Sequence, residues 1–300
     1  MRNKTIIWLI TAAVMLLLGS VLFIGAMIAA GDLTNLSTTR YETITHTVTE
    51  DFQSLSFETR RADITILRAE DDICRVVCKE SEKETFTVSA EDGVLTVRET
   101  NLKKWYDHIG IDGDAPAITV YLPGAAYDRL TVHSVTGDIH VASHAAFAHM
   151  DCEVATGDVT CHDAVSGQIK INTSTGDIRI VGGAPEMLDL TVTTGDITLA
   201  DIRPENLRVD VNSGSISLRD VTVSARLCLQ STSGDIELDR CDAAELFIKT
   251  TSGDVEGSLL SDKVFITKTS TGDIEIPRTG EGGTCEIITT TGDIEIEIVG

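Results

Sequence analysis

The fold is decided by stretches such as LDLTVTTGDITL (residues 188–199), LRVDVNSGSISL (207–218) and LCLQSTSGDIEL (227–238), which share one pattern. On both sides of a Ser/Thr-Gly-Asp/Ser-Ile corner, apolar residues alternate with polar ones, which is the period of a half-buried strand. The alternation slips by one residue at the glycine. Each stretch therefore predicts two short strands joined by a bend.

The corner recurs at intervals of 19 or 20 residues through the second half of the chain. The nine corner glycines are Gly137, Gly157, Gly176, Gly195, Gly214, Gly234, Gly253, Gly272 and Gly292. All but one are followed by an aspartate, namely Asp138, Asp158, Asp177, Asp196, Asp235, Asp254, Asp273 and Asp293, and the exception is Ser215. A period this short and this even is typical of a solenoid repeat.

A unit of this size cannot bury its apolar face alone, but coils stacked in parallel at ~4.8 Å share one continuous core. The sequence therefore predicts an all-β, parallel β-solenoid of 19–20-residue coils, regular over residues 131–300. Sequential stacking places the coil of Gly292 at the end of the rod, where its strand edge is open.

Residues 51–130 are predicted to form the irregular cap of the same solenoid. Leu55, Phe57 and Ile64 follow the column pattern, with Ala62 in place of the corner glycine. A second degenerate turn is expected around Gly93.

Residues 1–50 lie outside the repeats and are predicted to form three separate segments. Residues 1–4 include Arg2 and Lys4 and are predicted to stay in the cytoplasm, because positive charge flanks the cytoplasmic side of a membrane span. Residues 5–30 are predicted to form one transmembrane signal anchor, since the uncharged run exceeds the ~30 Å hydrocarbon thickness at ~1.5 Å per residue. A cleaved signal peptide is the alternative. Residues 31–50 are polar, threonine-rich and predicted to be a stalk.

The composition restricts the partners. The chain has 300 residues and a formal net charge of −23 at pH 7. An acidic surface of this size repels the phosphates of nucleic acids, so no nucleic-acid partner is expected. The expected partners are the membrane, through the N-terminal helix, and another envelope protein or a cell-wall polymer.

The recurring TGDI and SGDI corners, the segment ITVYLP (residues 118–123) and the apolar N-terminus resemble a bacterial β-strand-repeat family of unknown function, often labelled putative adhesin. The resemblance covers residues 50–300. It implies a β-solenoid fold and a cell-envelope setting, and it carries over no catalytic or ligand-binding residue.

The corner aspartates have two interpretations. Each can cap its own corner by accepting backbone N–H bonds, as aspartate does in turns. Alternatively, the last four coils form two acidic columns that would hold Ca²⁺ or Mg²⁺ through oxygen ligands. Those columns are Asp235, Glu237, Asp254, Glu256, Asp273, Glu275, Asp293 and Glu295. Capping is preferred, so no cofactor is predicted.

A loop rich in basic and aromatic residues interrupts the strand pattern at Lys103, Lys104, Trp105 and Tyr106. Trp105 either plugs the cap or belongs to a loop that binds a glycan or a partner, because exposed aromatic residues are favoured contacts. Most of the seven cysteines occupy apolar columns and are expected to be buried and unbridged.

These observations together predict a non-enzymatic, membrane-anchored, extracytoplasmic solenoid for binding or scaffolding. The resemblance implies that its place is the bacterial cell envelope and that its role is adhesin-like or related to envelope stress. A structural spacer and a β-helix enzyme acting on cell-wall polysaccharide are the alternatives. The enzyme is disfavoured because the repeat accounts for nearly every acidic residue, and no catalytic constellation stands out.

Overall fold

The computed structural model describes residues 40–103, 115–124, 126–143, 146–163 and 165–300, with residues 8, 11, 12, 14–23 and 25 near the N-terminus. Residues 14–23 are helical. Within this part of the chain, no helix has the length and apolar character needed to cross a bilayer, so the anchor predicted over residues 5–30 is not confirmed.

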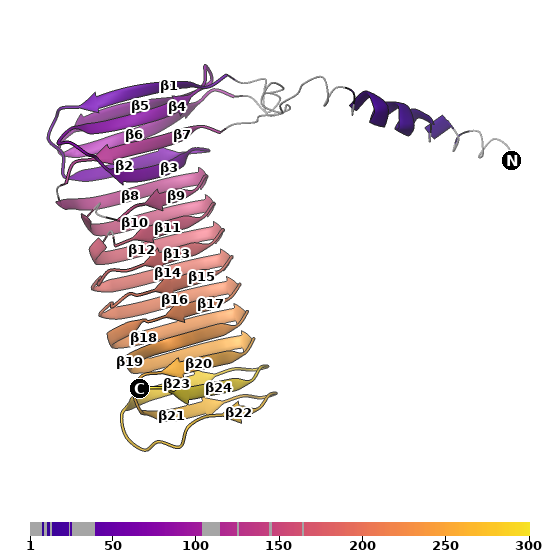
Figure 1. The fold of residues 1–300 in the computed structure, drawn as a ribbon, viewed down its shortest axis with the longest axis vertical. Coiled ribbons are helices and arrows are strands. Elements are labelled where there is room, and N and C mark those ends of the chain that lie inside the picture. Colours follow the sequence, from indigo (N-terminus) through magenta and orange to yellow (C-terminus); the bar gives the residue numbers. More distant parts are fainter. Residues whose placement is uncertain are drawn as a thin grey trace.

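The remaining described residues form a β-solenoid of stacked coils, as the repeat predicts (Figure 1). Each regular coil gives one longer strand to one sheet, here called sheet B, and one shorter strand to the opposite sheet, called sheet A. The corner glycine lies between the two strands. Strand β19 (Ile236–Ser252) runs through both sheets and joins them.

Sheet B has its strands in an order that differs from the chain order at both ends. Along the rod the strands are β5 (Glu84–Glu91), β6 (Val94–Asn101), β2 (Ser54–Thr59), β8 (Ala126–Thr136), β10 (Ala146–Thr156), β12 (Val165–Thr175), β14 (Met187–Thr194), β16 (Asn206–Ser213), β18 (Thr222–Ser233), β19, β23 (Gly283–Ile288) and β21 (Lys263–Lys268).

The strand order of sheet A also differs from the chain order at both ends. Its strands are β1 (Glu42–Val48), β4 (Cys74–Glu80), β7 (Ala117–Leu122), β3 (Asp63–Arg68), β9 (Ile139–Val141), β11 (Val159–His162), β13 (Ile178–Val181), β15 (Ile197–Ala200), β17 (Ile216–Arg219), β19, β20 (Val255–Leu259), β24 (Ile294–Ile298) and β22 (Ile274–Glu275).

The corners require glycine for two reasons. Gly195 has φ of +142°, which side chains rarely adopt, and a Cβ there would lie 2.1 Å from the carbonyl oxygen of Gly176 in the preceding coil. All nine corner glycines share this positive φ. Dihedral angle and close stacking thus select the same residue.

The core lies between the two sheets and is built from the predicted apolar columns. Leu188 and Leu190 of β14 and Ile197 and Leu199 of β15 are all completely buried. Parallel register repeats this arrangement from coil to coil, because Ile178, Ile197 and Ile216 are direct neighbours across β13, β15 and β17.

The N-terminal end is closed by antiparallel strands. β4 pairs antiparallel with β7, β1 with β4, and β5 with β6. The stalk prediction is therefore wrong for Glu42–Val48, which form β1; backbone pairing with β4 orders this polar segment. The turn expected at Gly93 is the Asp92-Gly93 turn of the β5–β6 hairpin rather than a solenoid corner.

At the C-terminal end the stacking is not sequential, which corrects the expectation for Gly292. The last coil, β23–β24, inserts between β19–β20 and the coil β21–β22 that precedes it in the chain. Ile294 is 1% exposed, whereas the equivalent Ile274 is 44% exposed at the rod's end. The end coil carries Thr267 in a core column, and a polar residue is better placed where it stays half-exposed.

At the N-terminal end a coil is likewise inserted out of chain order. The coil β2–β3 lies between β6–β7 and β8–β9, although it comes first in the chain. Leu55 and Phe57 pair with Leu130 and Val132, so Ala62 stands where later coils carry the corner glycine.

Candidate functional site

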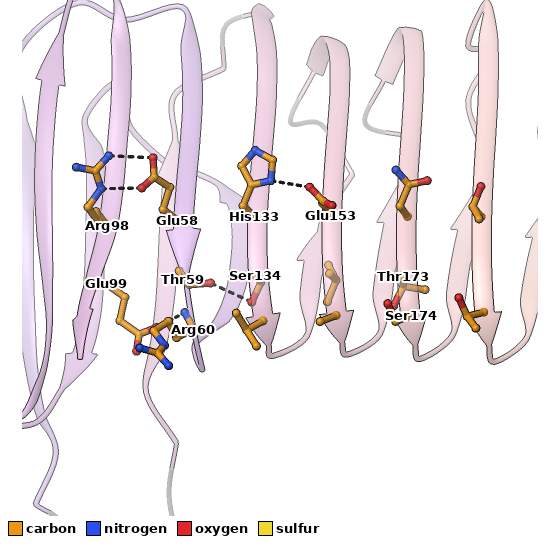
Figure 2. Close-up of a pocket in the computed structure, with 16 residues that line it drawn as sticks. Glu58, Thr59, Arg60, Arg98, Glu99, His133, Ser134, Glu153, Thr173 and Ser174 are labelled. Carbon is orange, nitrogen blue, oxygen red and sulfur yellow. Dashed lines mark hydrogen bonds and ion pairs between the residues drawn. The ribbon is translucent and has the colours of Figure 1, made fainter. Parts of the chain in front are cut away.

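A groove of about 740 Å³ crosses the outer face of sheet B near its N-terminal end. Strands β6, β2, β8, β10, β12 and β14 each contribute an outward side chain four residues before the corner or its equivalent, as Figure 2 shows. In spatial order these are Arg98, Glu58, His133, Glu153, Asn172 and Thr191.

One end of the groove is charged. Arg98 donates two hydrogen bonds to Glu58, at 2.7 Å from Nε and 2.9 Å from its second donor nitrogen. This interaction holds the pKa of the Glu58 carboxyl below its ordinary value, with a smaller contribution from His133. His133 Nδ1 lies 3.3 Å from a carboxylate oxygen of Glu153. The four side chains thus alternate in charge along the groove whenever His133 is protonated.

Buried hydrogen bonds support the charged end. Thr59 Oγ1 donates to Ser134 Oγ at 3.0 Å beneath the groove. The Glu99 carboxylate accepts hydrogen bonds from the backbone N–H groups of Arg60 (2.5 Å) and Arg61 (2.9 Å), which fixes the corner after β2. The groove side chains therefore stand on a rigid scaffold.

The other end of the groove is uncharged. It is lined by Asn172, Ser174, Thr191 and Thr193, which offer amide and hydroxyl groups. Val135 of β8, at the charged end, adds an apolar surface and is 54% exposed. Donors and acceptors that recur once per strand suit an extended polar ligand better than a compact one.

The predicted corner residues have a structural role that differs from the expected one. Seven of the eight corner aspartates accept, through the carboxylate, a hydrogen bond from the backbone N–H of the residue that follows the glycine in the neighbouring coil, rather than from their own corner. The eighth, Asp273, lies in the end coil, and its N–H donates to Asp293. The bonds from Asp177 to Asp158 and from Asp196 to Asp177 measure 2.8 and 2.7 Å. Parallel stacking in register brings the next corner within reach, which the corner sequence alone does not reveal.

The acidic columns of the last coils do not converge. Glu237, Glu256, Glu295 and Glu275 are register neighbours in that order, one per coil. Asp254 and Asp293 already accept backbone hydrogen bonds. Across the described residues there is no group of three or more His, Cys, Asp or Glu side chains that could hold a metal ion.

Lys103, predicted as part of a binding loop, is instead buried. Its Nζ lies 2.8 Å from a carboxylate oxygen of Glu84, and their side chains are 2% and 0% exposed. The Tyr41 hydroxyl donates to the same carboxylate at 3.1 Å. Lys103 therefore anchors the cap, because a buried charge needs a partner. Lys104, Trp105 and Tyr106 lie outside the described residues.

The cysteines are free, and six of the seven are buried. Burial raises the pKa of the Cys74 thiol to about 11 and those of Cys78 and Cys285 to about 12. Cys228 alone is half-exposed.

The groove was missed in the sequence because it lies on outward positions that do not repeat. Arg98 and Glu58 also belong to irregular coils, whose pairing with the coil of His133 only the structure provides. A comparison of the column four residues before each glycine would have shown the charged residues His133 and Glu153 next to the polar Asn172 and Thr191.

Comparison with known proteins gives one family. The sequence profile of the Toastrack DUF4097 family matches residues 52–214 and again residues 188–300. This confirms the resemblance to an unknown-function β-strand-repeat family. No curated protein is similar enough to this chain to be matched.

Several solved structures are similar at low identity. A "putative adhesin" from Bacteroides fragilis is 12% identical, with a TM-score of 0.47, covering 86% of this chain and 97% of its own. A "putative adhesin" from Parabacteroides distasonis is 11% identical, with a TM-score of 0.48, covering 86% and 98%. A "putative lipid binding protein" from the same species is 15% identical, with a TM-score of 0.44, covering 85% and 97%. None of these descriptions names an enzymatic activity.

Proposed function

Because this chain belongs to the Toastrack family, a β-solenoid family without an assigned activity, we propose that it is a non-enzymatic binding protein of the bacterial cell envelope. Its ligand is an extended, polar cell-wall polymer, and its binding surface is the groove across β6, β2, β8, β10, β12 and β14. The observation that carries the proposal is the row of six outward hydrogen-bonding side chains in register.

The charge of the molecule indicates what kind of polymer it binds. With a net charge of −23, the protein repels polyanions at long range. In the groove Arg98 is already paired with Glu58, and His133 with Glu153. An uncharged glycan, whose hydroxyl groups both donate and accept, therefore fits better than an anionic polymer.

Binding rather than hydrolysis is the better reading of the charged end of the groove. Glycoside hydrolysis uses a pair of carboxyl groups, one of which must be protonated to act as the general acid. In the groove Arg98 holds the pKa of the Glu58 carboxyl below its ordinary value, and the Glu153 carboxylate pairs with His133, so neither carboxyl group is arranged as that acid.

The N-terminal segment completes the proposal. Residues 5–30 contain no charged side chain and follow Arg2 and Lys4, which favours a single-pass anchor with its N-terminus in the cytoplasm. The solenoid then lies outside the membrane, where it reaches wall polymers and other envelope proteins. Fractionation of cells followed by protease treatment of intact protoplasts tests this placement: a soluble or protease-protected solenoid contradicts it.

Co-sedimentation with insoluble glycan strands, stripped of peptides and teichoic acids, tests the ligand. The full-length protein in mild detergent is expected to pellet with the glycan, and the double variant Asn172→Leu and Thr191→Leu to lose most of this binding. Thr198→Leu, on the outer face of sheet A, is the matched control and should bind normally. Equal binding by the parent protein, the double variant and the control would contradict the groove as the binding surface. Absence of binding by the parent protein would favour a structural spacer.

A further inference from the structure

A second depression, of about 340 Å³, lies on the outer face of sheet B, farther along the rod than the groove. Met187, Cys228 and Phe247 line it from β14, β18 and β19. All three project outward, since they alternate with the buried Leu188, Leu227 and Leu246. Solenoid packing does not require apolar residues here.

These residues depart from the repeat. Six residues before the corner glycine, successive coils carry polar or charged outward residues, namely Thr131, Asp151, Lys170, Asp189 and Arg208. The same column then changes to Cys228 and Phe247, which are neighbours in register. Because the small Cys228 side chain lies between Arg208 and Phe247, the surface is hollowed there.

The rim of the depression is cationic. Arg208 and Arg226 line it, and no acidic side chain does. Arg208 is neutralised by Asp210, at 2.7 Å, and lies 4.0 Å from Asp189. Arg226 is exposed, and within the described residues it forms no ion pair shorter than 4.0 Å, although Glu245 is its register neighbour on β19. An available guanidinium beside an apolar hollow is unusual in a molecule with a net charge of −23.

We propose that this depression binds a small amphiphilic carboxylate, with its apolar ring or short chain against Met187, Cys228 and Phe247 and its carboxylate on Arg226. The volume is at the lower end of the range for ligand sites, which excludes a large ligand. Arginine matches a carboxylate with two parallel hydrogen bonds. This site is separate from the glycan groove and extends the function beyond it.

Cys228 supplies a local probe, since the other six cysteines are buried. The full-length protein in nanodiscs of zwitterionic lipid is treated with iodoacetamide, and mass spectrometry follows alkylation of Cys228. Millimolar 4-phenylbutyrate is expected to slow this reaction several-fold. The neutral 4-phenyl-1-butanol and the cationic 4-phenylbutylamine are expected to protect much less, because neither pairs with Arg226.

Two variants define the outcome. Arg226→Gln should weaken protection by 4-phenylbutyrate about fivefold, the effect of one exposed ion pair, without changing the alkylation rate in the absence of ligand. Arg179→Gln removes the same charge from sheet A and should leave protection intact. Equal protection by the amine, equal protection in Arg226→Gln, or no protection of the parent protein overturns the proposal.

Discussion

The Asp158 carboxylate accepts a hydrogen bond from the backbone N–H of Asp177 in the neighbouring coil, at 2.8 Å. The same bond, at 2.7 to 3.0 Å, links each of the following pairs of acceptor and donor: Asp63–Asp138, Asp138–Asp158, Asp177–Asp196, Asp196–Ser215, Asp235–Asp254, Asp254–Asp293 and Asp293–Asp273. Ser215, which has no carboxylate, interrupts this ladder. The aspartates therefore join neighbouring coils, and their recurrence at all but one corner of the repeat stabilises the stack.

Loss of one ladder carboxylate is expected to destabilise the rod modestly. Asp177→Ala removes the acceptor for Asp196 N–H and should lower the free energy of unfolding by about 1 kcal/mol, a typical value for one hydrogen bond. Asp177→Asn keeps an acceptor oxygen and should cost less. Urea unfolding measures both, and equal losses would show that charge, rather than the hydrogen bond, is what matters.

The column two residues after the glycine is the centre of the core. Ile197 is completely buried, so Ile197→Asp should cost more than ~3 kcal/mol by burying an unpaired charge. Thr198→Asp, on the outward face of the same strand, is the control and should change stability little. Thermal unfolding followed by circular dichroism gives the comparison; similar melting temperatures for the two variants would contradict the assigned strand facing.

The inserted last coil is tested by cross-linking. Ile288 of β23 lies between Lys249 of β19 and Lys268 of β21 across sheet B, and it is a register neighbour of both. Neighbouring strands lie ~4.8 Å apart, a Cα separation that a disulfide can span. The double variant Lys249→Cys and Ile288→Cys should therefore oxidise readily to an intramolecular disulfide.

The matched pair Lys249→Cys and Lys268→Cys should not oxidise, because its positions are two strands apart. Peptide mapping of the oxidised proteins distinguishes the pairs. Preferential bridging of the second pair would mean that the coils stack in chain order.

Alkaline pH should destabilise the protein. Burial raises the pKa of Cys78 and Cys285 to about 12, against ~8.5 for an unfolded cysteine. Above pH ~8.5 the unfolded state loses thiol protons that the folded state retains, so the stability present at neutral pH declines until the folded thiols ionise near pH 12. Urea midpoints at pH 8 and pH 10.5 measure the loss, and Cys285→Val should make it smaller.

The sequence by itself determined the solenoid and its buried columns. Its 19–20-residue period, with alternation on both arms of a glycine corner, leaves one way to bury the apolar residues, namely stacking in parallel register. The one-residue slip of the alternation at each glycine indicated the bend between the two strands of a coil. The degenerate coil at Ala62 was also recognisable, because Leu55, Phe57 and Ile64 keep the column spacing.

Only the tertiary structure decided which coils are neighbours at the ends. Every coil offers the same backbone ladder, and the preference of Thr267 for a half-exposed place distinguishes the coil of Gly272 from that of Gly292 only once the coils are stacked. The groove was hidden for a related reason: Arg98 and His133 meet around Glu58 only because β2 lies between β6 and β8. Outward positions are free of the packing constraint that makes core columns repeat, so their arrangement is visible only after the strands are placed side by side.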